Sequence, residues 1–230
     1  MRKKLLFIVT LCLLSCSEDK TLQNISSIEN PNFVLIFMDD LGYGDIMPFG
    51  SINYETPHIN KLAKEGMLFT NFYSVQAVCS ASRAALLTGS YSNRIGISGA
   101  LMPYSTTGLN ENEITIAELL KEKGYATSIF GKWHLGFQEK FLPLNHGFDT
   151  YLGLPYSNDM WPVDFDGNQI SDSSDWRKKS YPQLPLIEDF KKIDEIRTLE
   201  DQAKLTTLYT ERSVEFINNN KDNPFFLYVP

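Results

Sequence analysis

An unbroken apolar run, Phe-Val-Leu-Ile-Phe-Met, occupies residues 33–38. A strand with one face in water alternates apolar and polar residues, so an unbroken run predicts a strand buried on both faces, as in a parallel sheet. Residues 125–130 and 225–229 are predicted to form two more strands, and helical patterns separate the three. The sequence therefore predicts an α/β protein with a mostly parallel central sheet between two layers of helices.

Local signals indicate the elements between these strands. Helix-start residues, stop glycines and helical spacing predict helices over residues 57–65, 82–88, 115–124 and 205–217. Residues 67–73 are predicted to form a further strand. Residues 160–200 are polar and aromatic, and we expect them to form an excursion from the main sheet.

Length and composition favour one domain rather than several. The chain has 230 residues, of which 43% are hydrophobic, enough for a sizeable core. The formal net charge is −7, and no Lys/Arg-rich run follows the first few residues, so no nucleic-acid partner is expected. The final residue, Pro230, directly follows a predicted buried strand, where a domain seldom ends. We therefore expect residues 32–230 to be the N-terminal part of a domain that is truncated at its C-terminus.

The N-terminus carries the features of an export signal. Basic residues at positions 2–4 precede an apolar run over residues 5–14, which is too short to span a membrane, so residues 1–15 are predicted to be a signal peptide. The sequence Leu-Leu-Ser-Cys, ending at Cys16, resembles a bacterial lipobox in which that cysteine is lipidated. Residues 16–31 would then be a flexible tether. The protein is expected to be exported and lipid-anchored, at the bacterial outer membrane or in the periplasm; an ordinary secretory signal is the alternative.

One cysteine, Cys79, is left over once the N-terminal signal is accounted for. The chain has three cysteines, of which Cys12 leaves with the signal peptide and Cys16 would be acylated. Cys79 then has no partner for a disulfide in an oxidising compartment. It is therefore either buried and inert, or chemically used.

Polar residues follow two of the predicted strands. Asp39 and Asp40 come directly after the first run, and Lys132 and His134 follow the strand at residues 125–130. Ligands bind beyond the carboxyl ends of strands in open α/β sheets, so these side chains are expected near a site. Adjacent carboxylates suit a hard cation such as Ca²⁺ or Mg²⁺. Alternatively, the aspartates cap a turn, the lysine is solvated and the histidine is packed in the core.

The segment Cys-Ser-Ala-Ser-Arg, from Cys79 to Arg83, precedes a short predicted helix. A helix N-terminus presents free N–H groups and a partial positive charge, which favour an anion. The guanidinium of Arg83 adds a planar donor that is always charged. The segment therefore predicts a seat for a sulfate or phosphate group, with a buried structural cysteine as the alternative.

This segment resembles the signature of the sulfatase family. The pattern Cys-x-Ala-x-Arg followed by Ala-Ala-Leu-Leu-Thr-Gly matches it, with Ala81 where proline is commoner. Four further motifs occur in the family's order. They are the aspartate pair, Gly-Lys-Trp-His-Leu-Gly from Gly131, Asn-His-Gly-Phe-Asp from Asn145 and Pro-Tyr-Ser ending at Ser157. The resemblance covers about residues 32–230. It implies an alkaline-phosphatase-like α/β/α sandwich and the N-terminal portion of an arylsulfatase-like, formylglycine-dependent sulfuric ester hydrolase.

The resemblance also implies the groups that would make up the metal site. Asp39, Asp40 and position 79 would bind a divalent metal, with Ca²⁺ expected before Mg²⁺. A formylglycine-generating or anaerobic sulfatase-maturing enzyme would oxidise Cys79 to Cα-formylglycine. The hydrated form of that aldehyde would be the nucleophile.

The remaining matches imply catalytic and substrate-binding roles. Arg83 would orient and stabilise the modified residue, and Lys132 would contact both the sulfate and the formylglycine hydroxyl. His134 would be the base of the second half-reaction. Ser157 would touch the substrate, although a hydroxyl that only caps its loop is the alternative.

The expected substrate is a sulfated carbohydrate or an aryl sulfate. Two other functions remain open: hydrolysis of phosphate or phosphonate monoesters by the same superfamily, and non-catalytic binding of sulfated glycans. The family's further metal and sulfate ligands cannot be assigned within these 230 residues, so the fragment alone is expected to be inactive.

Overall fold

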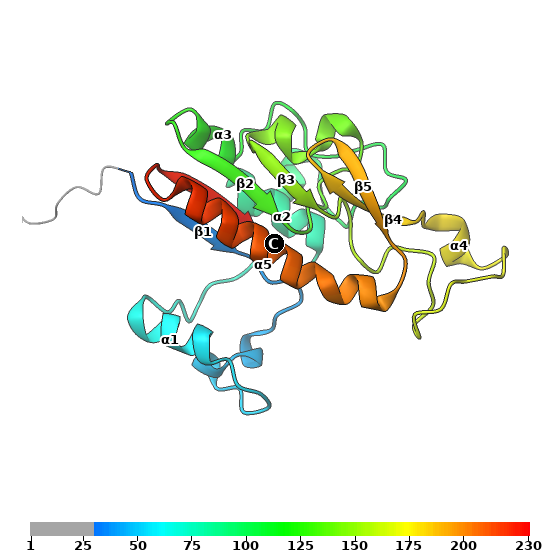
Figure 1. The fold of residues 1–230 in the computed structure, drawn as a ribbon, viewed down its shortest axis with the longest axis horizontal. Coiled ribbons are helices and arrows are strands. Elements are labelled where there is room, and N and C mark those ends of the chain that lie inside the picture. Colours follow the sequence, from blue (N-terminus) through cyan, green and yellow to red (C-terminus); the bar gives the residue numbers. More distant parts are fainter. Residues whose placement is uncertain (1–29) are drawn as a thin grey trace, which may run out of the picture. The chain divides into compact units, whose positions relative to one another are not determined.

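The computed structural model describes residues 30–230 (Figure 1). The predicted signal peptide, the lipid site Cys16 and nearly all of the tether lie outside the described residues and stay predictions. Within the described part, no helix has the length and apolar character needed to cross a bilayer.

One six-stranded sheet organises residues 30–230, in the order β1-β6-β2-β3-β4-β5. Its strands, in chain order, are β1 Phe33–Ile36, β2 Ala126–Phe130, β3 Thr150–Gly153, β4 Leu184–Glu188, β5 Lys191–Ile196 and β6 Phe225–Val229. The first four in sheet order pair in parallel, whereas β4 and β5 add an antiparallel edge. β6 therefore lies between β1 and β2, although it is last in the chain.

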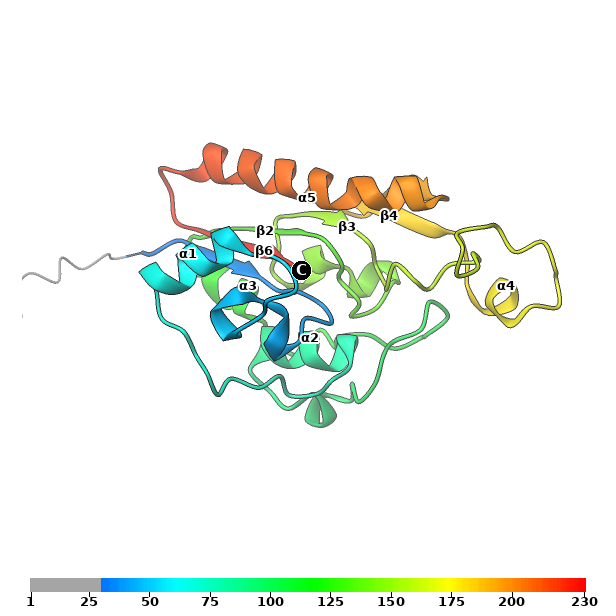
Figure 2. The same cartoon turned by 90° about the horizontal axis from the view of Figure 1, so that it is seen from below.

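Helices cover both faces of this sheet (Figure 2). The α-helices are α1 Pro57–Glu65, α2 Cys79–Thr88, α3 Ile116–Lys121, α4 Trp176–Ser180 and α5 Leu199–Asn220. Short 3₁₀ helices occur at Tyr43–Asp45, Met47–Phe49, Ser92–Ile95, Glu139–Phe141 and Pro143–His146. The long helix α5 lies along one face, and α2 and α3 lie on the other.

Alternate residues of the central strands enter two separate cores. In β6, Phe226 packs with Leu87 of α2 on one face, whereas Leu227 packs with Leu205 of α5 on the other. Burial on both faces explains why residues 225–229 form a continuous apolar run, and in β2 even the polar Thr127 and Ser128 are fully buried. The predicted α/β architecture with a mostly parallel sheet is confirmed.

The prediction that residues 33–38 are buried on both faces is wrong. In β1, Val34 is 47% exposed and Ile36 is 62% exposed. This strand is at the sheet edge and pairs only with β6 among the described strands, so an apolar run did not guarantee coverage.

Two other sequence-based predictions also need correction. Residues 67–73 form turns and irregular structure rather than a strand, and Tyr73 is 80% exposed. Strand propensity is realised only when a partner strand offers its hydrogen bonds and packing surface, and none of the strands within residues 30–230 pairs with this segment. Residues 160–200 are only partly an excursion, because β4 and β5 join the sheet as an edge hairpin.

The backbones of Gly131, which follows β2, and Gly153, which ends β3, approach each other closely. This approach gives a prediction about stability. A Cβ atom at Gly153 would lie 1.7 Å from the carbonyl oxygen of Gly131, a distance no structure tolerates. We expect Gly153→Ala to lower the free energy of unfolding by about 3 kcal/mol or to leave the protein insoluble. Gly44→Ala is the control, since its Cβ would meet nothing within 4 Å. Denaturant unfolding in which both variants match the wild type would contradict this packing.

Candidate active site

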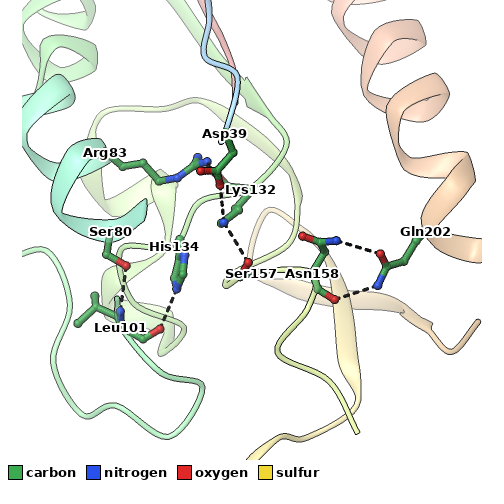
Figure 3. A network of polar contacts seen from close by, with 9 residues as sticks. All are labelled: Asp39, Ser80, Arg83, Leu101, Lys132, His134, Ser157, Asn158 and Gln202. Carbon is green, nitrogen blue, oxygen red and sulfur yellow. Dashed lines mark hydrogen bonds and ion pairs between the residues drawn. The ribbon is translucent and has the colours of Figure 1, made fainter. Parts of the chain in front are cut away.

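The candidate site forms where β1 and β2 end and α2 begins (Figure 3). Asp39 follows β1, Lys132 follows β2, and Arg83 extends from α2 toward both. Because the strands are parallel neighbours of β6, their carboxyl ends open at the same edge of the sheet. Residues separated by 44 and 93 positions in the chain are thereby brought into hydrogen-bond distance.

Arg83 is the fixed centre of this cluster. Its side chain is 1% exposed, and its guanidinium donates to the carbonyl oxygen of Lys132 (2.6 Å) and to Oδ2 of Asp39 (3.0 Å). The guanidinium carbon also lies 5.5 Å from the ring centroid of Phe37. A planar donor held on several sides keeps one orientation, so its positive charge is fixed in place.

Asp39 and Lys132 complete a chain of polar contacts. Nζ of Lys132 donates to Oδ2 of Asp39 (2.5 Å) and to Oγ of Ser157 (3.0 Å). Burial alone would raise the pKa of Asp39, but the hydrogen bond and charge of Lys132, together with Arg83, hold that pKa below its usual value. Asp39 is therefore a carboxylate at any physiological pH, shared between two cations.

A cavity of about 520 Å³ lies beside this cluster. Asp39, Asp40, Cys79 and Ser82 line it, with aromatic residues Tyr43, Phe49, Phe69, Phe72 and Tyr73. Asp40 has a φ of 53°, a left-handed conformation that aspartate tolerates better than most residues. The aspartate pair and Cys79 thus face one space, although they lie 39 residues apart.

Cys79 is the first residue of α2, three positions earlier than the predicted start of that helix. Its thiol is free and partly buried. The cap residue Val78 makes no side-chain hydrogen bond to the helix, so no side chain of the cap satisfies the first N–H groups. The residue therefore stands where backbone donors and the helix dipole favour a negative charge.

His134 lies at the buried end of the site. Its ring is 0% exposed and its backbone has a φ of 57°, a strained conformation for a non-glycine residue. Nε2 lies 2.8 Å from the carbonyl oxygen of Leu101, whereas Nδ1 has no hydrogen-bond partner among residues 30–230. Burial, with a further contribution from the positive charge of Lys132, lowers the pKa of His134 to about 4. The ring is therefore neutral at pH 7.

This charge state leads to a testable expectation. The His134 ring should titrate near pH 4 in the folded protein and near 6.5 when unfolded. The unfolded chain then binds the additional proton as the pH falls from 6.5 to 4, so this residue lowers stability across that window by roughly 3 kcal/mol. NMR titration of the ring measures the pKa directly, with His134→Gln to identify its signals. A midpoint at or above pH 6 would exclude this environment.

The aspartate pair fits a hard cation in its chemistry but is not a complete site. Carboxylate oxygens are suitable ligands for Ca²⁺ or Mg²⁺, and both aspartates line the same cavity. Within the described range, however, no three His, Cys, Asp or Glu side chains lie close enough to hold a metal. Asp39, Asp40 and Cys79 line one cavity but do not form a complete ligand set among residues 30–230, and their role as metal ligands stays a prediction.

Residues 31–230 match the model of the family described as Sulfatase. The chain belongs to the sulfatase family. Its relatives include human N-acetylgalactosamine-6-sulfatase, 36% identical over 213 residues, a match that covers 86% of this chain and 38% of the human protein. The chain thus spans about two fifths of the length of that sulfatase.

Solved sulfatase structures share the fold. The PsFucS1 sulfatase from Pseudoalteromonas sp. superposes with a TM-score of 0.75 at 32% identity, covering 87% of this chain and 43% of that one. The crystal structure of Ps i-CgsB in complex with k-i-k-neocarrahexaose gives a TM-score of 0.69 at 31% identity, covering 86% and 44%. The alkaline-phosphatase-like fold expected for a sulfatase is thus confirmed.

The sulfatase chain brings most of the predicted site residues together. Hydrogen bonds join four of them directly, namely Asp39, Arg83, Lys132 and Ser157. Asp40 and Cys79 line the adjacent cavity, and within residues 30–230 no side-chain hydrogen bond or ion pair joins either of them to that network. The role expected of each residue stays a prediction.

The contacts that support these residues could not be predicted from the sequence. Ser80 accepts a hydrogen bond from the backbone N–H of Leu101 (3.0 Å), whose carbonyl in turn contacts His134. Asn158 and Gln202 exchange two hydrogen bonds between the Ser157 loop and α5. No sequence pattern reveals such contacts. The only available signal was the position of the Ser80 hydroxyl, directly after Cys79.

Proposed function

We propose that the full-length protein hydrolyses sulfate esters. The observation that carries this proposal is the convergence of Asp39, Arg83 and Lys132 beside the helix start at Cys79. A sulfate ester resists attack because its anionic oxygens repel nucleophiles. Two fixed positive charges beside a helix N-terminus offset that repulsion and stabilise negative charge in the transition state.

Lys132 is suited to hold a substrate oxygen. Its ammonium has three N–H donors, of which Asp39 and Ser157 accept two. The third is left for the sulfate. The side chain is only 13% exposed and is braced on both sides, so it needs little rearrangement when the substrate arrives.

Arg83 and His134 would act on the residue at position 79. Arg83 is fixed by Asp39 and the Lys132 carbonyl, and it lies one helical turn after position 79, where it would orient that residue. His134 is neutral and keeps the lone pair of Nδ1, so this nitrogen can accept a proton near neutral pH.

Two groups would complete the chemistry. Asp39, Asp40 and position 79 would hold a divalent cation, Ca²⁺ by preference, which polarises the sulfate when bound. Formylglycine made from Cys79 by a maturation enzyme would take up one water molecule, and the hydrated aldehyde would supply two hydroxyls, one to attack sulfur and one to allow release of the sulfate.

A sulfated glycan is the proposed substrate class. The name of the human relative, N-acetylgalactosamine-6-sulfatase, and the complex of a structural neighbour with k-i-k-neocarrahexaose support this choice. An exported protein at a bacterial surface would also meet such polysaccharides.

Export and anchoring through Cys16 are a separate part of the proposal. In a bacterial host, the full-length protein is expected in the membrane fraction, and Cys16→Ala is expected to move it to the soluble fraction. Loss of the acyl mass from the N-terminal peptide provides the second measurement. If the wild-type protein is found entirely in the soluble fraction, lipidation at Cys16 is wrong and residues 1–15 are an ordinary secretory signal.

The decisive experiment uses full-length protein produced with a maturation enzyme. Mass spectrometry of the peptide containing residue 79 should show an aldehyde in place of the thiol. The same preparation should turn over an aryl sulfate faster than the matched aryl phosphate. Faster phosphate turnover would favour a phosphate or phosphonate monoesterase. An intact thiol with no turnover, but with binding of sulfated glycan, would favour the non-catalytic alternative.

A further inference from the structure

The hydrogen bond of His134 fixes where its ring proton lies. A carbonyl oxygen can only accept, so the 2.8 Å contact with Leu101 requires the proton to be on Nε2. The neutral ring then carries its lone pair on Nδ1, which no residue among 30–230 contacts by hydrogen bond. The Leu101 peptide therefore selects which nitrogen of His134 is available as a base.

The Leu101 peptide is itself held by one side chain. Its N–H donates to Oγ of Ser80 at 3.0 Å, and both Ser80 and His134 are 0% exposed (Figure 3). In the described chain, this is the one hydrogen bond that ties residues 98–104 to α2. The order of contacts is thus Ser80 hydroxyl, Leu101 peptide, His134 ring.

This arrangement links the two halves of the site. Ser80 is the residue after Cys79 and shares its helical turn, whereas His134 follows β2. Without the hydroxyl, the partly buried Leu101 N–H would lose its partner, which costs up to about 1–3 kcal/mol and favours movement of the loop. A moved loop would take the Leu101 carbonyl away from Nε2 and remove the constraint on the tautomer.

We propose that Ser80 is a positioning residue that fixes, through the backbone of Leu101, the tautomer and orientation of His134. This proposal rests on the proposed function, because it assumes that Nδ1 accepts the proton during turnover. Ser80 itself touches neither substrate nor reacting atoms. A hydroxyl that merely fastened a surface loop would affect stability but not the tautomer of a buried ring.

The test compares Ser80→Ala, which removes the acceptor, with Ser80→Thr, which keeps a hydroxyl. Ser92→Ala is the matched control, because Ser92 is also 0% exposed but its hydroxyl has no partner in the described residues. Full-length proteins are produced with the maturation enzyme, and kcat is expressed per molecule converted at residue 79. This correction is needed because residue 80 adjoins the modified residue.

We expect Ser80→Ala to lower kcat for an aryl sulfate at least about tenfold with KM changed less than twofold. Long-range ¹H–¹⁵N spectra of ¹⁵N-histidine protein should show the Nε2–H tautomer of His134 in the wild type and a mixture of tautomers in Ser80→Ala. Ser80→Thr should recover both properties, and Ser92→Ala should match the wild type.

Each other outcome has a defined meaning. An unchanged tautomer and an unchanged kcat in Ser80→Ala overturn the proposal, even if its stability falls. If Ser80→Ala does not fold, Ser80→Cys replaces it as the variant with a weaker acceptor, and a tautomer equal to that of Ser80→Thr overturns the proposal. If matured wild-type protein turns over no sulfate ester, the proposed function fails, whereas the spectra still decide the role of Ser80.

Discussion

Cys79→Ala is expected to lower sulfate ester turnover by roughly 10⁴-fold or more while leaving the protein folded. Loss of a nucleophile removes the covalent route, and losses of this size or larger are typical when an essential nucleophile is deleted. The thiol is only partly buried and makes no hydrogen bond or disulfide in the described chain, so its removal should cost little stability. Turnover of an aryl sulfate and circular dichroism of the same preparation measure the two properties.

Cys79→Ser is the sharper control for this prediction. A serine oxygen could attack sulfur once and release the alcohol, leaving a sulfated serine with no second hydroxyl to free it. We expect at most one turnover per enzyme and a residue-79 peptide whose mass has increased by one SO₃ group. Sustained turnover by either variant would remove Cys79 from the mechanism.

Arg83→Met should damage both stability and activity. Methionine fills a similar volume but leaves the Lys132 carbonyl and Asp39 without their buried donor. Removing one partner of a buried ion pair costs about 3–5 kcal/mol, and we expect about 3 kcal/mol because the Asp39 side chain is 34% exposed. Turnover should fall roughly 100-fold or more, since a fixed positive charge near the sulfate is lost.

The same substitution at an exposed position is the control for Arg83→Met. Arg197 is 61% exposed and pairs with Glu195 on the surface, where such contacts contribute at most about 1 kcal/mol. Arg197→Met should therefore unfold at nearly the wild-type denaturant concentration and keep full activity. Equal stability of both methionine variants would mean that the Arg83 cluster does not support the fold.

The parts of the fold that could be predicted are those with strong local signals. The strands predicted at residues 125–130 and 225–229 are central in the sheet, and both faces of each are covered. The apolar run in β1 is half exposed, since coverage depends on neighbours that a local pattern does not contain. Residues 67–73 have strand-like composition but no partner strand, so they form turns.

The candidate site was predictable to the extent that reactive side chains directly follow strands. Asp39 and Lys132 meet because parallel strands end at one edge, a rule that needs no coordinates. The contact between His134 and Leu101 was not predictable, because the group involved is a backbone carbonyl. Any residue type supplies that group, so nothing in the sequence distinguishes position 101.

The position of β6 between β1 and β2 determines the order in which the protein can be assembled. The backbone N–H of Phe225 donates to the Asn32 side chain across 193 positions of the chain. Among the described strands β6 is the only neighbour of β1, so during synthesis β1 cannot make this pairing until residues 225–229 have left the ribosome. Asp39 directly follows β1, so its place at the sheet edge depends on that late pairing, and until then exposed apolar residues in β1 are free to pair wrongly. The carboxylate encoded among the first residues of the domain is thus among the last groups to reach its place.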